Sequence, residues 1–300
     1  MIPGIDWLVR AARFLGVVGL FCVCASTRCA AAELPARAVK CLVFETLMHA
    51  GKPDLRRHGI EPIEIAYEAQ LWNPGAAADS YPDLKKVLSA AHRAAMRQSI
   101  LVLDIERWPV EAGVTDRLVE ARIEQLQHIV GWIRGEYPHV RLGYFGLMPS
   151  AAVTWALAPA ESSDGIAWRR ANARLDSLAA SVDVVLPSLY TYSNDPDRWV
   201  RVAVENIRQA RRYGKPVYAF VWPKYSERNT ELAYQYVGDD FWRLQLETVC
   251  RHADGVVLWG GWDPVHKRPE RWSREASWWL ATQRFLAAQS EASEAHMGSR

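Results

Sequence analysis

The sequence predicts an α/β fold: a (β/α) barrel of the TIM type, irregular, with about seven parallel strands. Short apolar runs alternate with longer stretches of helical periodicity, the pattern of parallel strands joined by crossover helices. The apolar runs are nearly continuous, which is typical of strands buried on both faces. An open doubly wound sheet is the alternative, but residues 45–52 after the first run are not the glycine-rich phosphate turn that such a sheet usually carries.

The expected strands are runs rich in Val, Ile, Leu, Tyr and Trp. They cover residues 39–46, 63–66, 100–106, 141–146, 182–190, 216–222 and 255–260.

The expected helices lie between these runs. In 115–137, apolar residues recur at helical spacing and Pro138 closes the pattern. Gly214 ends the pattern of 198–213. The other helical stretches are 81–98, 168–180 and 241–252.

Residues 1–32 are typical of a secretory signal peptide. Arg10 and Arg13 precede an apolar run at 14–25, and three alanines ending at Ala32 form a cleavage site. An uncleaved anchor is the alternative. We expect cleavage near Ala32, a secreted or periplasmic protein, a single barrel catalytic domain over 33–288 and a disordered tail over 289–300. No second apolar segment approaches membrane length, so we expect no integral membrane domain.

The mature chain is expected to be electrically neutral. The whole chain has a formal net charge of +2, and residues 1–32 carry three arginines and one aspartate. This balance gives no reason to expect a nucleic acid partner, and we expect a monomer. The 14 tryptophans suggest a carbohydrate ligand, although Trp is also an ordinary core residue.

Two of the five cysteines, Cys41 and Cys250, remain after the signal is removed. In an exported protein such a pair indicates either a disulfide bond or two buried thiols. The histidines show no metal-ligand spacing, so we expect no metal and no cofactor. Ser188 lacks the Gly-x-Ser-x-Gly setting of a serine hydrolase.

Asp104 and Glu106 are the central catalytic candidates. The spacing i, i+2 puts both carboxylates on one face of a strand at its C-terminal end, where barrel enzymes keep their active sites. Two such close acids repel each other, so that one holds its proton near neutral pH, as glycoside cleavage requires. A pair bound to the Arg-rich segment 208–212 is the alternative. The other expected strands also end in carboxylates and aromatic residues: Glu45, Tyr67, Glu68, Tyr144, Phe145, Tyr190, Tyr192, Trp222 and Trp259.

Five short motifs, in order, resemble the hyaluronidase family of glycoside hydrolases. They are IAYEAQLW at 65–72, DIERWP at 104–109, LGYFG at 142–146, LPSLY at 186–190 and GVVLWG at 255–260. The resemblance implies an irregular seven-stranded barrel and a retaining, substrate-assisted mechanism. In that mechanism Glu106 is the general acid/base, and Asp104 orients the N-acetyl group whose oxygen is the nucleophile.

The resemblance also assigns the surrounding residues. Tyr144 and Tyr190 would bind the acetamido group and the reacting sugar, Trp259 would form the floor, and Tyr67 and Glu68 would contact neighbouring sugars. It also implies a disulfide between Cys41 and Cys250. Trp108, Tyr192, Trp222 and Asp263 are further candidates for substrate binding.

Several features depart from the family. The mature chain is shorter than the animal enzymes, and Ile105 stands where they carry Trp. A polyanion such as hyaluronan favours a basic mouth, to which Arg107, Lys224, Lys267 and Arg268 could contribute.

The expected function is a secreted glycoside hydrolase acting on a polysaccharide or oligosaccharide that contains N-acetylhexosamine. The alternatives are a non-catalytic carbohydrate-binding barrel and a conventional two-carboxylate glycosidase. In the latter, Glu45, Glu68 or Asp263 would be the second acid.

Overall fold

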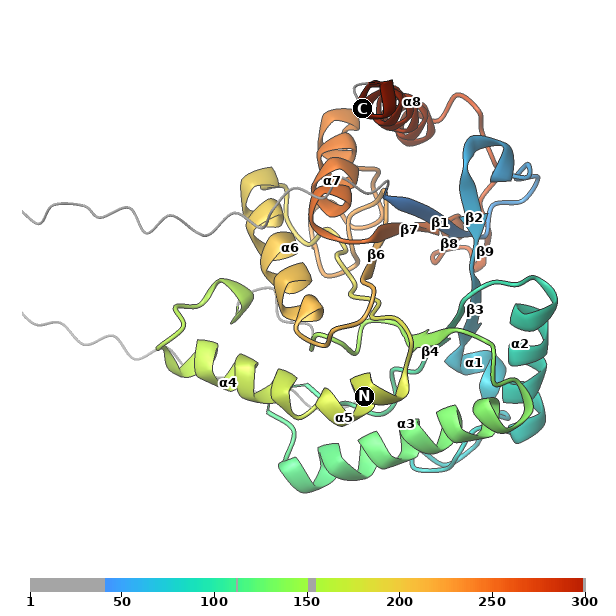
Figure 1. The fold of residues 1–300 in the computed structure, drawn as a ribbon, viewed down its shortest axis with the longest axis vertical. Coiled ribbons are helices and arrows are strands. Elements are labelled where there is room, and N and C mark those ends of the chain that lie inside the picture. Colours follow the sequence, from blue (N-terminus) through green and yellow to red (C-terminus); the bar gives the residue numbers. More distant parts are fainter. Residues whose placement is uncertain (1–40, 112, 151–154, 299–300) are drawn as a thin grey trace, which may run out of the picture. The chain divides into compact units, whose positions relative to one another are not determined.

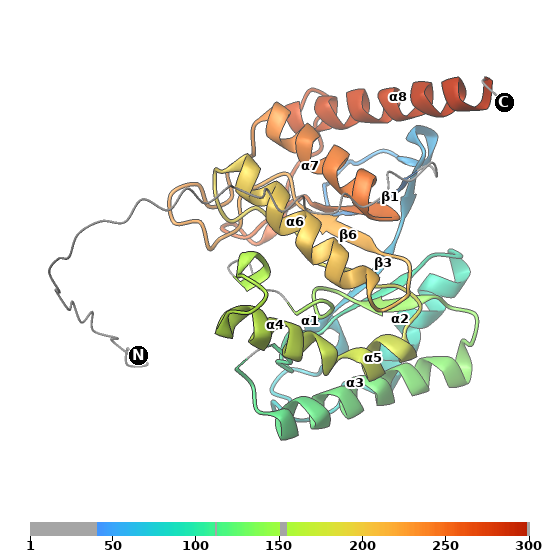
Figure 2. The same cartoon turned by 60° about the vertical axis from the view of Figure 1, so that its left-hand side comes forward.

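Parallel strands surrounded by helices form the centre of the computed structural model, which describes residues 41–111, 113–150 and 155–298 (Figures 1 and 2). The strands are β1 (Leu42–Leu47), β2 (Ile60–Pro62), β3 (Glu64–Tyr67), β4 (Leu101–Asp104), β5 (Leu142–Tyr144), β6 (Tyr218–Val221), β7 (Gly255–Gly260), β8 (Trp262–Asp263) and β9 (Arg268–Pro269). The helices are α1 (Glu68–Leu71), α2 (Leu84–Met96), α3 (Asp116–Glu136), α4 (Ser163–Ala173), α5 (Asp176–Ser181), α6 (Pro196–Arg211), α7 (Asp239–His252) and α8 (Ser277–Gly298), with 3-10 turns at Arg56–His58 and Trp155–Leu157. The predicted signal peptide lies outside the described residues.

The barrel strands form two hydrogen-bonded sets, in the orders β2-β1-β7-β6 and β3-β4-β5, and β8 and β9 form a separate antiparallel hairpin. One chain segment joins the sets on one side, because β2 pairs with β1 and its continuation β3 pairs with β4. Residues 184–191 join them on the other side through the bridges Phe145–Leu186 and Ser188–Phe220. Within the described residues, the predicted TIM-type barrel is therefore confirmed. The barrel is irregular where the β2–β3 segment and residues 184–191 join the two sets.

Side chains alternate between the inside of the barrel and the layer under the helices. Val102, Leu186 and Val257 pack together in the small inner cluster. Leu101 and Leu103, one residue before and after Val102, belong to the large outer cluster. This period of two decides which residues at the strand ends face the barrel mouth.

The C-terminal segment differs from the prediction. The expected disordered tail at 289–300 is wrong for residues 289–298, which continue α8. This helix is anchored near its start, where the indole of Trp242 on α7 donates a hydrogen bond of 2.9 Å to the Thr282 hydroxyl. Alanine and glutamate recur after that anchor and favour propagation of the helix.

The predicted helix at 168–180 is two helices, α4 and α5. The first ends at Ala173, and Asp176 begins the second with a negative charge at the helix N-terminus, where such a charge is favourable. A break of this kind interrupts the periodicity only slightly, which is why one helix was predicted.

A disulfide bond joins Cys41 to Cys250, with 5.3 Å between their Cα atoms. Cys41 precedes β1 and Cys250 lies in the last turns of α7, so the bond ties the first barrel strand to the helix that leads into β7. None of the described helices has the length and apolar character that crossing a membrane requires.

Candidate active site

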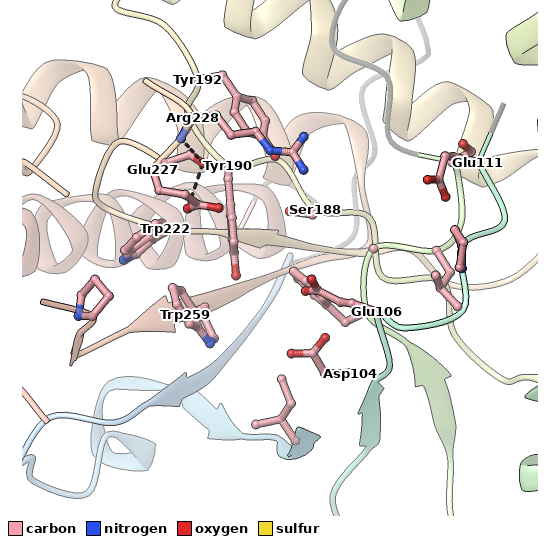
Figure 3. Close-up of a pocket in the computed structure, with 18 of the residues that line it drawn as sticks. Asp104, Glu106, Glu111, Ser188, Tyr190, Tyr192, Trp222, Glu227, Arg228 and Trp259 are labelled. Carbon is pink, nitrogen blue, oxygen red and sulfur yellow. Dashed lines mark hydrogen bonds between the residues drawn. The ribbon is translucent and has the colours of Figure 1, made fainter. Parts of the chain in front are cut away.

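Asp104 and Glu106 lie at the mouth of the barrel, at the C-terminal end of β4. Asp104 is two residues after the inward-facing Val102, so the alternation of the strand turns its carboxylate inward. Glu106 follows beyond the end of the strand and is exposed. Both residues line a pocket of about 650 Å³ (Figure 3).

The same two acids line a second pocket, of about 640 Å³, whose wall includes residues 67–69 and 72–76. The acid pair therefore lies where the two pockets meet. An extended ligand could occupy both pockets while its middle contacts the carboxylates.

Burial is the main cause that raises the pKa of Asp104 to about 7, and the Glu106 and Glu68 carboxylates raise it further. One oxygen of Asp104, Oδ1, is buried and has no hydrogen-bond partner among the described residues. Near neutral pH the pair therefore retains a proton.

Aromatic rings form one wall of the first pocket. Tyr190 stacks on Trp259, with ring centroids 5.5 Å apart and planes inclined by 29°. Trp222 meets Trp259 edge-on at 4.9 Å. Burial raises the pKa of Tyr190 well above its usual value, so its hydroxyl stays protonated as a hydrogen-bond donor. This wall gives a sugar ring both an apolar face and a polar group.

Tyr192 lines the same pocket, and burial raises its pKa. The guanidinium of Arg228 lies 5.9 Å from the centre of its ring.

Tyr67 and Glu68 make protein contacts rather than standing free in the cleft. The Tyr67 hydroxyl accepts a hydrogen bond of 2.9 Å from the indole of Trp259. The Glu68 carboxylate accepts hydrogen bonds from the backbone N–H groups of Glu106 (3.0 Å) and Arg107 (2.8 Å). Both residues also line the second pocket, so their role as sugar contacts stays a prediction.

The predicted role of Tyr144 is wrong. Tyr144 lies on the outer face of β5 with Leu142, and its buried hydroxyl donates a hydrogen bond of 2.7 Å to the Leu126 carbonyl on α3. Its neighbour Phe145 faces the pocket instead. The sequence shows two adjacent aromatic residues here, and only the register of the strand decides which one points inward.

Trp108 and Asp263 also differ from their predicted roles. Trp108 lies in the pocket wall, but its side chain is fully buried and its indole donates to the Ala78 carbonyl at 3.1 Å. Asp263 holds the turn between β8 and β9, where its carboxylate accepts from the backbone N–H groups of Val265 and His266, both at 3.0 Å. Neither side chain presents a free polar group to a substrate.

Each of the three acids considered as an alternative second carboxylate is engaged in contacts within the protein. Glu45 lies on the outer face of β1, bonded to the Leu47 N–H at 2.7 Å and to Lys52. Glu68 and Asp263 make the contacts given above. These positions disfavour a two-carboxylate mechanism that uses Glu45, Glu68 or Asp263.

The cations expected to form a basic mouth are also mostly engaged elsewhere. Arg107 pairs with Glu68 at 2.9 Å, and the buried Lys224 pairs with Glu270. Lys267 and Arg268 lie in or beside the β8–β9 hairpin and do not line either pocket.

The pocket contains residues that the sequence did not single out. Glu111 comes from the loop after β4, and Glu227 and Arg228 come from the loop after β6 (Figure 3). The place of Trp262 could be predicted from the sequence, because it follows Trp259 by three residues. The positions of Glu111, Glu227 and Arg228 depend on loop conformation, which leaves no periodic pattern in the sequence. Among the described residues, no cluster of three or more His, Cys, Asp or Glu side chains could hold a metal ion.

Comparisons with known proteins support the fold. A scan of protein-family models and a search of curated protein sequences each found no match to the chain. Bee venom hyaluronidase aligns with a TM-score of 0.55 at 15% sequence identity, covering 84% of this chain and 99% of that one. The structure of bee venom hyaluronidase with a hyaluronic acid tetramer aligns with a TM-score of 0.54 at 16% identity, covering 84% of this chain and 95% of that one.

A glycoside hydrolase family 5 enzyme from Prevotella bryantii aligns with a TM-score of 0.46 at 11% identity, covering 83% of this chain and 97% of that one. At such identities a likeness establishes the fold alone. The chain is an α/β barrel of the TIM type, similar in fold to bee venom hyaluronidase.

Proposed function

We propose that the protein is an exported, monomeric glycoside hydrolase that cleaves a polysaccharide containing N-acetylhexosamine, with retention of configuration. The observation that carries this proposal is the position of Asp104 and Glu106, where two pockets meet beside the Tyr190–Trp259 stack. A polymer can then extend to both sides of the acids while one sugar packs on the aromatic wall.

In the proposed reaction Glu106 gives its proton to the glycosidic oxygen as that bond breaks. The carbonyl oxygen of the substrate's acetamido group forms a bond to the anomeric carbon and gives a cyclic oxazolinium ion. The carboxylate of Glu106 then takes a proton from water, whose oxygen attacks the same carbon and reopens the ring. Two displacements at one carbon leave its configuration unchanged.

Asp104 would accept a hydrogen bond from the acetamido N–H and stabilise the positive charge of the oxazolinium ion. The place of Asp104 in the lining of both pockets supports this role. The raised pKa of Asp104, about 7, means that the free pair holds a proton near neutral pH. Binding of the amide to Asp104 would leave this proton on Glu106, where the first step needs it.

The charges of the two pockets favour an uncharged polymer over a polyanion. Arg107 is neutralised by Glu68, which leaves Arg228 as the remaining cation among the pocket-lining residues that the structure describes. Glu111 and Glu227 line the first pocket and, within the described residues, form no ion pair. We therefore propose a substrate of neutral N-acetylhexosamine units rather than a chain of uronic acids.

Export is proposed from the N-terminal signal and is supported by the disulfide, because such bonds persist in oxidising compartments.

The decisive experiment compares wild type with Glu106→Gln and Asp104→Asn on chitin oligomers, hyaluronan and chondroitin. We expect wild-type cleavage of the neutral oligomers, loss of cleavage in both variants, and retained sugar binding by Glu106→Gln. An oxazoline-type analogue should inhibit the wild type. Sugar binding by the wild type without cleavage of any polymer would instead support a carbohydrate-binding barrel, and inversion of configuration would exclude substrate assistance.

A further inference from the structure

We propose that Glu68 and Tyr67 are positioning residues: Glu68 fixes the backbone that carries the general acid, and Tyr67 fixes the aromatic wall opposite. The role assigned to Glu106 in this inference rests on the proposed function. Both residues belong to the junction between β3 and α1, so two consecutive side chains reach the acid on β4 and the wall on β7.

The contact of Glu68 is directed at the backbone of the acid itself. One carboxylate oxygen, Oε2, accepts from the N–H groups of both Glu106 (3.0 Å) and Arg107 (2.8 Å). Glu106 lies beyond the last residue of β4, where no strand pairing holds it. These charge-assisted hydrogen bonds therefore replace a missing strand neighbour at the position where the acid must be held.

Arg107 adds a second restraint to the same loop. Its Nε donates to the other oxygen of Glu68 at 2.9 Å, and its guanidinium stacks over the Trp72 ring at 4.1 Å. Trp72 is only 3% exposed, so it is a rigid support. Both oxygens of Glu68 are thus used, and the loop is fixed through its main chain and its side chain.

Tyr67 makes the matching contact on the other wall. Its hydroxyl accepts the indole N–H of Trp259 at 2.9 Å, and Trp259 in turn stacks on Tyr190. Because Tyr67 and Glu68 are adjacent in the chain, their two contacts set the spacing between Glu106 and the wall against which the sugar would pack. Catalysis is sensitive to such spacing, since a misplacement of about 1 Å can cost on the order of 100-fold in rate.

Glu68 also acts on the acid pair through its charge. Titratable groups from three segments face Asp104. Glu106 belongs to its own segment, and Tyr67 and Glu68 come from the β3–α1 junction. Tyr190 comes from the segment after α5. Glu68 is one of the groups that raise the pKa of Asp104. Removing this charge should lower that pKa, whereas shortening the side chain should mainly change the position of the loop.

Two substitutions of Glu68 separate these effects. Glu68→Asp keeps the charge but withdraws the carboxylate, and we expect kcat to fall roughly 10- to 100-fold with KM within about twofold of wild type. Glu68→Gln keeps the length but removes the charge, and we expect the alkaline limb of the pH–kcat/KM profile to move to lower pH. A purely structural role would not move that limb.

Glu64→Gln is the matched control. Glu64 is the first residue of β3, the strand that leads into Glu68, and it binds Arg93 (2.6 Å) and Arg97 (2.7 Å), away from the acid pair. We expect this variant to change the free energy of unfolding but neither kcat nor the alkaline limb. A shift of the limb in Glu64→Gln equal to that in Glu68→Gln would overturn the proposal.

Two measurements on the full chain need no activity. NMR titration should give Asp104 a lower pKa in Glu68→Gln than in wild type, and hydrogen exchange at the Glu106 and Arg107 amides should be faster in Glu68→Asp. These changes in a protein that cleaves no sugar would uphold the positioning role of Glu68 and reject the proposed function. Unchanged amide exchange, together with wild-type kcat in both variants, would reject the positioning role itself.

Discussion

The ring of Tyr190 stacks on the indole of Trp259, with 5.5 Å between their centroids, although the two residues lie 69 positions apart in the sequence. They come from two different motifs, and β6 lies between β7, which carries Trp259, and the segment that carries Tyr190. Their joint surface faces the pocket that contains Asp104 and Glu106. This surface is the expected platform for the reacting sugar.

Trp259→Ala should therefore raise KM more than it lowers kcat. Loss of the aromatic face removes about 1.5–3 kcal/mol of apolar contact, which corresponds to roughly 10- to 100-fold in KM. Trp259→Phe should lie between the alanine variant and wild type, because it keeps a ring but loses the hydrogen bond to Tyr67. Steady-state kinetics on neutral oligomers measure both constants.

Tyr144→Phe is the control for this experiment. Its hydroxyl binds the Leu126 carbonyl outside the barrel, so we expect an unchanged KM and a loss of about 1 kcal/mol in the free energy of unfolding. A large rise in KM in Tyr144→Phe would contradict the placement of this residue on the outer face.

The activity should decline as the pH rises through about 7. The mechanism needs one proton on the acid pair, and the pair loses that proton near the pKa of Asp104, about 7. The pH dependence of kcat/KM reports this ionisation in the free enzyme. A rate that kept rising between pH 7 and 9 would show that the pair does not supply the proton.

Asp104→Asn should stabilise the protein at alkaline pH. The folded-state pKa of Asp104 is raised from 3.8 to about 7, so the folded chain holds a proton that the unfolded chain has released. Stability from this group is present at low pH and is lost as the pH rises from about 4 to 7. At pH 8 we expect the variant to gain about 1–4 kcal/mol in the free energy of unfolding.

Urea denaturation at two pH values tests this expectation. At pH 3 the carboxyl of Asp104 is mostly protonated in both states, so the gain should be nearly absent. An equal gain at pH 3 and pH 8 would point to packing rather than charge.

The sequence predicts that Asp104 and Glu106 lie at the barrel mouth because its evidence is local, and their catalytic role stays a prediction. Asp104 ends an apolar strand and Glu106 follows two residues later, and residues 101–106 alone show both features. The barrel is predicted for a similar reason, since the alternation of strand and helix repeats along the chain. Contacts between distant segments cannot be predicted in this way. The contact of Glu68 with the Glu106 backbone, for example, joins residues 38 positions apart.

The residues placed wrongly show which information the sequence lacks. Tyr144 and Phe145 are both aromatic, so composition cannot tell which faces the mouth. Glu45 ends a run that resembles the others, yet its carboxylate turns outward to the Leu47 N–H. Glu111 and Glu227 stand on loops, whose paths follow from the whole barrel rather than from any repeating pattern.

The Cys41–Cys250 disulfide should contribute substantially to stability. It closes a loop over a sequence separation of 209 residues, which restricts the unfolded chain. We expect Cys41→Ala/Cys250→Ala to lose about 2–5 kcal/mol in the free energy of unfolding. The activity of the folded variant should stay close to wild type, because neither cysteine lines the two pockets that contain the acid pair.

Wild type with and without a reducing agent provides the comparison for that variant. Reduction should lower the stability of wild type and leave the double variant unchanged. If the reducing agent destabilised both proteins equally, its effect would not come from this bond.

Two glycines in the same domain should respond in opposite ways to alanine. A Cβ on Gly143 of β5 would lie 2.4 Å from the Val184 carbonyl oxygen, so the joint between β5 and residues 184–191 depends on the missing side chain. A Cβ on Gly131, inside α3, would meet no atom within 4 Å. We expect Gly143→Ala to lose about 1–3 kcal/mol in the free energy of unfolding and Gly131→Ala to gain up to about 1 kcal/mol.

Chemical denaturation of both variants tests the close approach that completes the barrel. Because Phe145 and Ser188 line the pocket beside this joint, Gly143→Ala should also lower kcat, whereas Gly131→Ala should not. Equal stability of the two variants would mean that β5 and residues 184–191 are not held this closely, and the irregular closure of the barrel would then need another explanation.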